Sequence, residues 1–207
     1  DRDLMICNNE SGMCIGGVFG GIESGIKDTT TDVFLESAYF NPVYIRKTAR
    51  RHGLSTDASF RFERGVDPNG TLYALKRAAL LIKELAGGTI SSEIADVVAD
   101  ASVLEPFRVS VTYKNITRLI GKEIAVESIR NILSALEINI ESENEAGLEL
   151  LVPAYRVDVK READIIEEIL RIYGYNNVEP GKMVKSTIQH ADFPDKMKLQ
   201  NLVSESL

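Results

Sequence analysis

Apolar and polar residues alternate most regularly in the second half of the chain. The pattern there predicts, in order, a strand, two helices, a hairpin of two strands and a last helix. Two helices followed by a hairpin resemble a winged-helix arrangement, so we expect a small α+β domain over residues 103–179. The predicted bounds are 107–111 for the strand, 113–120 and 125–136 for the helices, 138–142 and 148–152 for the hairpin, and 161–173 for the last helix.

The first half of the chain mixes shorter strand and helix signals. Asn41-Pro42 predicts the capped start of a helix that ends at Gly53, and Asp67-Pro68 starts an amphipathic helix that Gly87 stops. We therefore expect part of a mixed α/β domain over residues 1–102. The strand-like segments are 4–7, 13–19, 33–40, 89–98 and, as a half-buried strand or an irregular segment, 59–65.

The last part of the chain has a different character. After Pro180 a linker is predicted to lead to a helix starting near Asp195, so residues 180–207 are expected to be a linker and the start of a further domain. The chain begins at Asp1 rather than Met and stops at Leu207 within an amphipathic run. We expect it to be a piece of a longer polypeptide.

Composition narrows the class of protein. The 207 residues are 44% hydrophobic and 27% charged, which is enough to bury a core and keep a soluble surface. A net charge of −7 argues against an electrostatic grip on nucleic acid by the whole chain. A local basic run remains at Arg46-Lys47 and Arg50-Arg51, either as a contact for phosphates or as a solvated helix face paired with nearby acids.

Cysteine usage and hydropathy indicate the compartment. Cys7 and Cys14 have neither the number nor the spacing of a disulfide framework or a metal site, so we expect free thiols in a reducing environment. No apolar stretch is long enough to cross a bilayer and no signal peptide opens the chain. These features predict a cytoplasmic protein without membrane contact.

Four carboxylates crowd around the start of the last predicted helix of the second half: Asp158, Asp164, Glu167 and Glu168. The last three share one helix face at spacings i, i+3 and i+4, where like charges repel. A cation, a basic partner or plain solvation can offset this repulsion, and acids near a helix start are also favoured by its dipole. Hard oxygen ligands without histidine or cysteine suit Mg²⁺ if a cation is present.

Two longer motifs make the chain recognisable. They are the segment of residues 50–68, which contains Ser-Phe-Arg-Phe-Glu-Arg-Gly-Val-Asp-Pro, and the segment of residues 153–175, which contains Pro-Ala-Tyr-Arg-Val-Asp and the acidic helix. In sequence and order both resemble the β-subunit of bacterial phenylalanyl-tRNA synthetase. The resemblance implies that 1–102 is the later part of an editing domain, that 103–179 is a small accessory domain, and that 180–207 begins a catalytic-like domain.

The same resemblance implies a function for the whole protein. Such a synthetase joins phenylalanine to tRNA(Phe) using ATP and Mg²⁺, as a heterotetramer of two α and two β subunits. Activation belongs to the α-subunit, so we expect this chain alone to be inactive. By motif, the β-side ligands of a Mg²⁺ site shared with the α-subunit correspond to Asp158, Asp164, Glu167 and Glu168.

The resemblance also implies a site that hydrolyses mischarged Tyr-tRNA(Phe). Glu36 matches the glutamate that senses the tyrosine hydroxyl, and Gly17 and Gly20 match positions where the substrate lies close to the backbone. Thr56 and Ala58 match the opposite side of the pocket. The alternatives are an exposed glutamate on an edge strand, turn glycines, a capping threonine and an alanine that only packs.

Several other interpretations stay open on the sequence. Neither His52 nor His190 matches the histidine that the family places in the editing pocket, and no serine–histidine–aspartate or cysteine–histidine set is evident. A water positioned by backbone and substrate is therefore the expected attacking group. A free-standing deacylase and a nucleic-acid-binding module without catalytic role are the two competing hypotheses.

Overall fold

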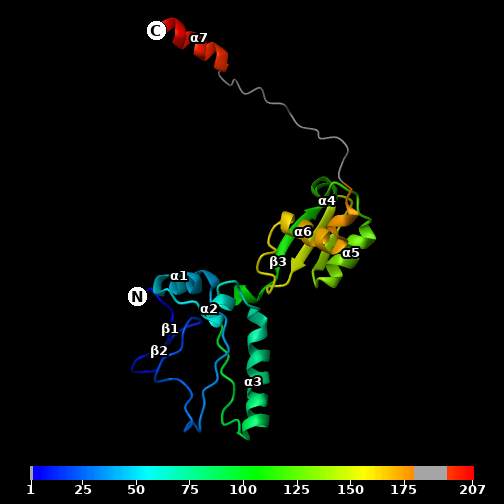
Figure 1. Cartoon of the computed structure of the whole chain (residues 1–207). Coiled ribbons are helices and arrows are strands. Elements are labelled where there is room, and N and C mark those ends of the chain that lie inside the picture. Colours follow the sequence, from blue (N-terminus) through cyan, green and yellow to red (C-terminus); the bar gives the residue numbers. More distant parts are fainter. Residues whose placement is uncertain (1, 180–194) are drawn as a thin grey trace. The chain divides into compact units, whose positions relative to one another are not determined.

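The computed structural model describes residues 2–179 and 195–207, which form two compact units, Asp1–Tyr175 and Asn176–Leu207. The larger unit contains helices together with small antiparallel sheets, so the predicted α+β class is confirmed (Figure 1). Within it, residues 2–106 are called the first region and residues 107–175 the second region.

The first region is built around one hairpin and three helices. Strands β1 (Met5–Cys7) and β2 (Gly12–Ile15) pair antiparallel, and Ile6 lies opposite Cys14. Helices α1 (Pro42–His52), α2 (Asp57–Phe62) and α3 (Thr71–Ala86) follow. A small core joins the hairpin to α1 and α2; its residues are Val18, Ile45 and Ala49, with Ile15, Phe40, Leu54 and Phe62 packed against them.

Helix α1 has the start and stop that the sequence predicted. The Asn41 side chain accepts a hydrogen bond from the backbone N–H of Val43, and Pro42 occupies the first turn. At the other end Gly53 adopts φ 63°, a left-handed conformation that glycine takes without a Cβ penalty. Local chemistry is therefore enough to define this helix.

Two strand predictions in the first region are wrong, and a third segment, expected to be a half-buried strand or irregular, also differs. Residues 33–40 and 89–98 form no strand, because no other segment among the described residues pairs with them, and a strand needs a neighbour for its backbone hydrogen bonds. Phe34 is 97% exposed in the first of these segments. The alternating stretch 59–65 is mostly helical instead, because a reciprocal capping box between Thr56 and Ser59 starts α2 at Asp57.

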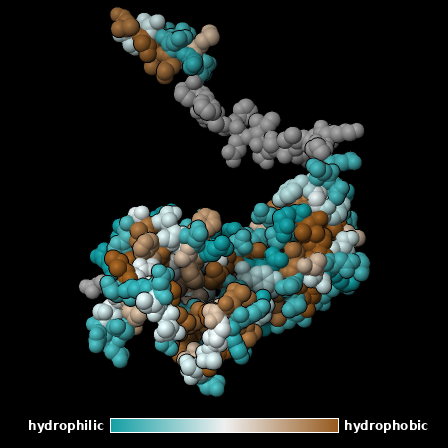
Figure 2. Space-filling view, turned by 60° about the horizontal axis from the view of Figure 1, so that its bottom comes forward, coloured by the Kyte–Doolittle hydropathy of each residue, from teal (hydrophilic) through white to brown (hydrophobic). Residues whose placement is uncertain are grey.

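Helix α3 has the predicted amphipathic pattern, but none of its residues is buried. The same region exposes apolar side chains in the segments before α1 and after α3, and apolar surface is visible across the face in Figure 2. Strongly exposed examples are Ile22, Phe34, Leu85 and Val97. The first region thus buries little of its apolar surface within this chain.

The second region packs helices against a three-stranded sheet with the order β3-β5-β4, in which both ladders are antiparallel (Figure 1). Its helices contact the sheet and one another and enclose a continuous core that includes Leu133, Leu150 and Ile169. Each predicted element of this region is present. The bounds are β3 Phe107–Thr112, α4 Tyr113–Ile120, α5 Val126–Ala135, β4 Asn139–Glu143, β5 Gly147–Val152 and α6 Glu162–Tyr173.

The second unit contains helix α7 (Lys196–Ser206), which the Asp195 side chain caps as expected. Its apolar side chains, such as Leu199 and Leu202, lie on its surface (Figure 2). The predicted linker falls on residues 180–194, which lie outside the described residues, as does His190. Among the described helices, none combines the length and apolar character needed to span a membrane.

Candidate functional site

A cavity of about 430 Å³ opens beside the small core of the first region. Four of the five residues predicted for the editing pocket line it: Gly17, Gly20, Glu36 and Ala58. They come from the turn after β2, from the irregular segment before α1, and from α2. The fold therefore brings together residues that are up to 41 positions apart in the sequence.

The turn after β2 forms one side of the cavity. Gly17 has φ +67°, and a Cβ added there would lie 2.7 Å from Cδ2 of Phe40. Glycine is therefore required at this position by both backbone and packing. Gly20 differs, because an added Cβ would meet no heavy atom within 4 Å, so a small side chain would fit there without a clash.

Aromatic rings form the floor of the cavity. Phe40 and Phe62 both line it and pack edge to face, with ring centroids 5.0 Å apart and an interplanar angle of 68°. Phe40 also contacts the core residues around Ile45, which fixes the ring in place. This floor is therefore apolar and suits a hydrophobic group.

Glu36 is the acidic group of this cavity. Within the described part of the chain its side chain forms no hydrogen bond and no ion pair. Although the residue as a whole is exposed, partial burial against its neighbours raises the pKa of its carboxyl. A carboxylate that is partly desolvated and has no protein partner is available to accept a hydrogen bond from a ligand.

Thr56, the fifth predicted residue, does not line the cavity. Its hydroxyl donates to the backbone carbonyl of Val18 at 2.6 Å and accepts from the backbone N–H of Ser59 at 3.0 Å. These two bonds tie the start of α2 to the turn that carries Gly17 and Gly20. Thr56 therefore supports the shape of the cavity, as the capping alternative anticipated.

Sequence reasoning missed several lining residues. Cys14 and Phe40 line the cavity but lie outside both motifs, and Phe62 lies within the motif of residues 50–68 but was not predicted as a pocket residue. Cys14 could be placed in part from the sequence. Side chains two residues apart on a strand lie on the same face, so the register of β1 and β2 determines which side chains form the wall of the cavity. The aromatic floor depends on packing between distant segments.

The predicted metal ligands are distributed differently. Asp164 accepts hydrogen bonds from the backbone N–H groups of Lys160 and Arg161, at 3.1 and 2.9 Å, and from the Arg161 guanidinium. Arg161 is the largest cause that holds the pKa of Asp164 below its usual value. Asp164 therefore caps α6.

Glu168 lies between two arginines. Arg171 donates to it at 2.7 Å and Arg156 at 3.1 Å, and the side chains of Arg156 and Glu168 are only 19% and 16% exposed. Arg171, followed by smaller contributions from Arg156, lowers the pKa of the Glu168 carboxyl. The repulsion expected from the sequence pattern is thus offset by protein cations at two of the four acids.

The other two carboxylates, Asp158 and Glu167, are exposed and take part in no hydrogen bond or ion pair among the residues described. No group of three potential ligands in the described chain is arranged to hold a metal ion. The residues of this chain therefore do not form a complete Mg²⁺ site by themselves. Asp158 and Glu167 retain the free oxygens that a site completed by another chain and water would need.

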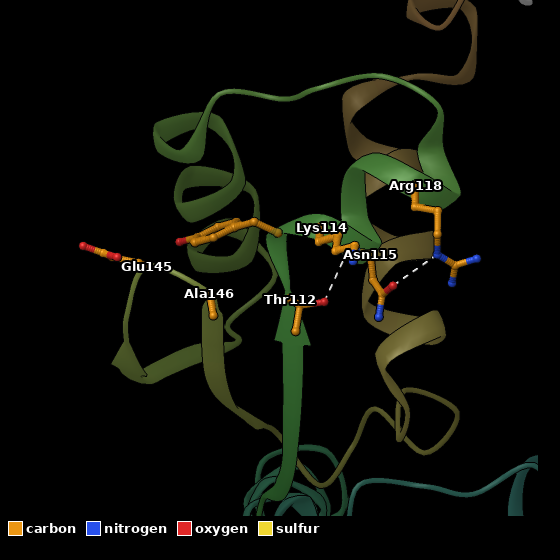
Figure 3. Close-up of a pocket in the computed structure, with 7 residues that line it drawn as sticks. Thr112, Lys114, Asn115, Arg118, Glu145 and Ala146 are labelled. Atoms are coloured by element: carbon orange, nitrogen blue, oxygen red, sulfur yellow. Dashed lines mark hydrogen bonds between the residues drawn. The ribbon is translucent and has the colours of Figure 1, made fainter.

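A second cavity, of about 740 Å³, lies at the start of α4 in the second region (Figure 3). Arg118 donates through Nε to the Asn115 side chain at 3.2 Å, and Thr112 caps the helix by accepting from the Asn115 backbone N–H. Lys114 also lines it, with Glu145 on the opposite side in Figure 3. The sequence predicted the helix that begins here but not this cavity.

The basic run on α1 is partly neutralised. Arg51 and His52 both contact the carboxylate of Asp3, and Arg46 donates to the backbone carbonyl of Glu63. Hydrogen bonding to His52 is the largest cause of the lowered pKa of Asp3. Arg51 therefore fits the alternative of a helix face paired with nearby acids, whereas Arg46 is bonded to a backbone carbonyl rather than to an acid.

Comparison with known proteins agrees with the two motifs. The B3/4 domain family matches residues 1–87 and the tRNA synthetase B5 domain family matches residues 109–175. Similar proteins include the phenylalanine–tRNA ligase beta subunits of Bacteroides fragilis, at 61% identity over 208 residues, and Porphyromonas gingivalis, at 49% over 208 residues. Both alignments cover 100% of this chain and 25% of the relative.

A more distant relative shows the same relation. The phenylalanine–tRNA ligase beta subunit of Thermotoga maritima is 40% identical over 203 residues, which are 98% of this chain and 25% of that protein. The chain therefore spans about a quarter of the length of the curated relatives that it matches.

Proposed function

The chain carries the B3/4 and tRNA synthetase B5 domains of the phenylalanine–tRNA ligase beta-subunit family, and on that premise we propose that it serves an enzyme that attaches phenylalanine to tRNA(Phe) with ATP. In this proposal it is a cytoplasmic segment of a β-subunit that works with an α-subunit in a heterotetramer. Its first region contributes to the site that hydrolyses mischarged Tyr-tRNA(Phe). The observation that carries the proposal is that Glu36, which has no hydrogen-bond or ion-pair partner among the described residues, lines a cavity together with glycines and two aromatic rings.

The chemistry of discrimination follows from that cavity. Tyrosine is phenylalanine with one added hydroxyl, and a hydrophobic pocket rejects such an analogue by only about a hundredfold. A second site that recognises the hydroxyl corrects the remaining errors. Glu36 accepts the phenolic hydrogen bond, whereas a bound phenylalanine that shields this acceptor from water leaves it unpaired, at a cost of about 1–3 kcal/mol.

The attacking group in this proposal is water. Among the described residues, the cavity offers no histidine and no hydroxyl paired with a base, and the Ser37 hydroxyl donates to the Thr71 carbonyl. Burial also raises the pKa of the Cys14 thiol, which makes it a poor nucleophile at neutral pH. The cavity therefore orients the amino acid and leaves bond cleavage to a positioned water.

The test compares the hydrolysis of mischarged Tyr-tRNA(Phe) with the hydrolysis of correctly charged Phe-tRNA(Phe). In the full-length enzyme assembled with its α-subunit, Glu36→Ala is expected to reduce the ratio of Tyr-tRNA(Phe) to Phe-tRNA(Phe) hydrolysis, with aminoacylation unchanged. Glu10→Ala is the matched control, because Glu10 is an exposed acid of the first region outside the cavity. An unchanged ratio in the Glu36 variant would count against the proposal.

We further propose that the acidic residues around the start of α6 bind Mg²⁺ together with the α-subunit. Asp158 and Glu167 supply the free oxygens, while Asp164 and Glu168 hold α6 and its arginines in place. Mg²⁺ is commonly held by one or two carboxylates, with water and other groups completing the octahedron. This arrangement does not require a complete site in the isolated chain.

Metal content and assembly test this second part. Glu167→Gln and Asp158→Asn are expected to lower the Mg²⁺ retained by the purified complex or to weaken its assembly, without unfolding the domain. Glu123→Gln is a suitable control, because Glu123 is an exposed acid on the same domain. Asp164→Ala is expected to act more broadly, because it also removes two backbone hydrogen bonds at the start of α6. Normal metal content and normal assembly in all three variants would refute the assignment.

One observation favours a nucleic-acid-binding module as a second candidate. Lys114 and Arg118 lie at the cavity at the start of α4, where a phosphate would also meet the helix N-terminus. Binding of tRNA and duplex DNA by the chain, measured across salt concentrations, separates the candidates. Absent or salt-insensitive binding would remove this one.

A further inference from the structure

The cavity of the first region contains a cysteine to which the proposed function gives no role. Cys14 lies on β2 opposite Ile6 of β1, and both side chains line the cavity. Together they form a wall that is apolar except for the thiol. Cys7, the other cysteine of the chain, is exposed and does not line the cavity.

The surroundings of Cys14 connect it to Glu36. Burial is the largest cause that raises the pKa of the thiol, and the negative charge of Glu36 is the next. Both residues line the same cavity, and the charge of the Glu36 carboxylate disfavours a thiolate at Cys14. At neutral pH the neutral thiol stands beside the acceptor that the proposed function uses.

We infer that Cys14 is a specificity-determining residue of this cavity, because it forms the wall beside Glu36 without competing for the carboxylate. This inference rests on the proposed function. A thiol is a weak hydrogen-bond donor and a small apolar group, so it leaves the Glu36 oxygens open to a phenolic hydroxyl. A serine hydroxyl is a much stronger donor and would occupy an oxygen that the ligand needs.

Size matters at the same position. The cavity has about 430 Å³, and its wall at Cys14 is formed by a short side chain. A leucine there would extend into the space between the β1–β2 wall and Glu36. The predicted result is a cavity that still has its acceptor but no longer admits the aromatic ring to it.

The first experiment tests the juxtaposition on the chain itself. The rates at which N-ethylmaleimide alkylates Cys7 and Cys14 are measured by peptide mass spectrometry as a function of pH, in the wild type and in Glu36→Gln. We expect Cys14 to react more slowly than Cys7, and the Glu36→Gln variant to speed Cys14 severalfold while leaving Cys7 unchanged. Glu36 has no protein partner among the described residues, so this variant leaves the fold intact. A Cys14 rate that does not respond to residue 36 would overturn the inference.

The second experiment tests the consequence in the assembled full-length enzyme. Cys14→Leu is expected to slow Tyr-tRNA(Phe) hydrolysis by about tenfold or more, on the scale at which added methylenes affect a fitted pocket. Cys14→Ser, which keeps the size, is expected to narrow the preference for Tyr-tRNA(Phe) severalfold, and Cys14→Ala to retain it. Cys7→Ser is the matched control and should behave as the wild type.

The outcomes separate this inference from the function on which it rests. If Glu36→Ala removes discrimination but Cys14→Ser and Cys14→Leu do not affect it, Cys14 only packs and the inference fails. If Glu36→Ala leaves discrimination unchanged, the proposed function fails, while the alkylation result still decides whether the two side chains are neighbours. Because serine is nearly isosteric with cysteine, Cys14→Ser remains informative even if Cys14→Leu does not fold.

Discussion

Glu36 in the first region and Glu168 in the second are both carboxylates beside a hydrophobic core, yet their surroundings move their pKa values in opposite directions. Burial raises the pKa of Glu36, which has no partner in the part of the chain that the structure describes, whereas Arg171 and Arg156 lower that of Glu168. The oxygens of a paired acid are occupied by contacts within the protein, whereas an acid in a cavity without such contacts can accept a hydrogen bond from a ligand. The difference explains why one carboxylate is a candidate for recognition and the other for structure.

The same contrast holds for packing. The second region encloses a continuous core between its sheet and its helices, while the buried apolar residues of the first region are Val18, Ile45 and Ala49 among those described. A region with few buried apolar contacts has low local stability, and binding sites are commonly found in such regions. The second region therefore stabilises itself, and the first region combines modest stability with a binding space.

The largest expected effect tests the core of the second region. Leu133 has no exposed surface, so Leu133→Ala is expected to reduce the free energy of unfolding by about 3 kcal/mol through lost burial and a remaining cavity. Amide hydrogen exchange in β5 measures it. Leu85→Ala is the control in the first region, where an 81% exposed side chain should change stability by less than about 0.5 kcal/mol. Equal losses in both variants would contradict the contrast between the regions.

A glycine pair tests the turn at the cavity. Gly17→Ala is expected to destabilise the first region by about 1–2 kcal/mol, because it forces a Cβ into a left-handed conformation against the Phe40 ring. Gly20→Ala meets open space and should stay within about 0.5 kcal/mol. Exchange of amides in α1 reports both. Equal changes in stability for the two variants would contradict a specific requirement for glycine at position 17 of this turn.

Acid should weaken the second region through Glu168. The folded pKa of this carboxyl lies below its ordinary value of 4.5, so its stabilising contribution is present above pH 4.5 and is lost as the pH falls through the lowered pKa. Glu168→Gln is expected to remove about 1 kcal/mol at neutral pH and to flatten this acid dependence. Denaturation at several pH values measures the change. An unaltered acid profile in the variant would show that the two arginines do not stabilise the folded state through Glu168.

The smallest expected effect is at alkaline pH. Burial, and then a hydrogen bond of 2.6 Å from its hydroxyl to Glu143, raise the pKa of Tyr113 to about 12. This contribution to stability is complete below the ordinary tyrosine pKa of 10 and is lost as the pH rises from 10 to about 12. Glu143→Gln is expected to lower the Tyr113 pKa, as measured from tyrosinate absorbance with Tyr113→Phe to identify the step. A Tyr113 step near pH 10, taken as the difference between the unmodified chain and Tyr113→Phe, would be inconsistent with this contact.

Local signals in the sequence were sufficient for many elements. Asn41 and Gly53 define α1, and Thr112 and Gly121 define α4, because caps and left-handed glycines act on residues next to them. The family resemblance likewise pointed to Gly17, Gly20, Glu36 and Ala58, and all four line one cavity.

Elements that depend on a partner were not predictable in this way. The apolar stretches 33–40 and 89–98 have strand-like composition, but no segment among the described residues pairs with them. The sequence pattern indicated that Asp164 and Glu168 are neighbouring unpaired acids. In the structure Arg161 donates to Asp164 and Arg156 donates to Glu168, and Arg156 lies 12 positions from Glu168 in the sequence.

By itself the sequence determined the class of the chain, most helix boundaries, the family motifs and the presence of an acidic residue among glycines. Only the tertiary structure decided which carboxylates are paired, that Thr56 braces the turn at Val18, and that Cys14 and two phenylalanines complete the cavity around Glu36. The physical reason is the distance along the chain over which each kind of interaction acts. Caps and periodicity act over one helical turn, whereas burial, ion pairing and cavity shape arise between segments that only folding brings together.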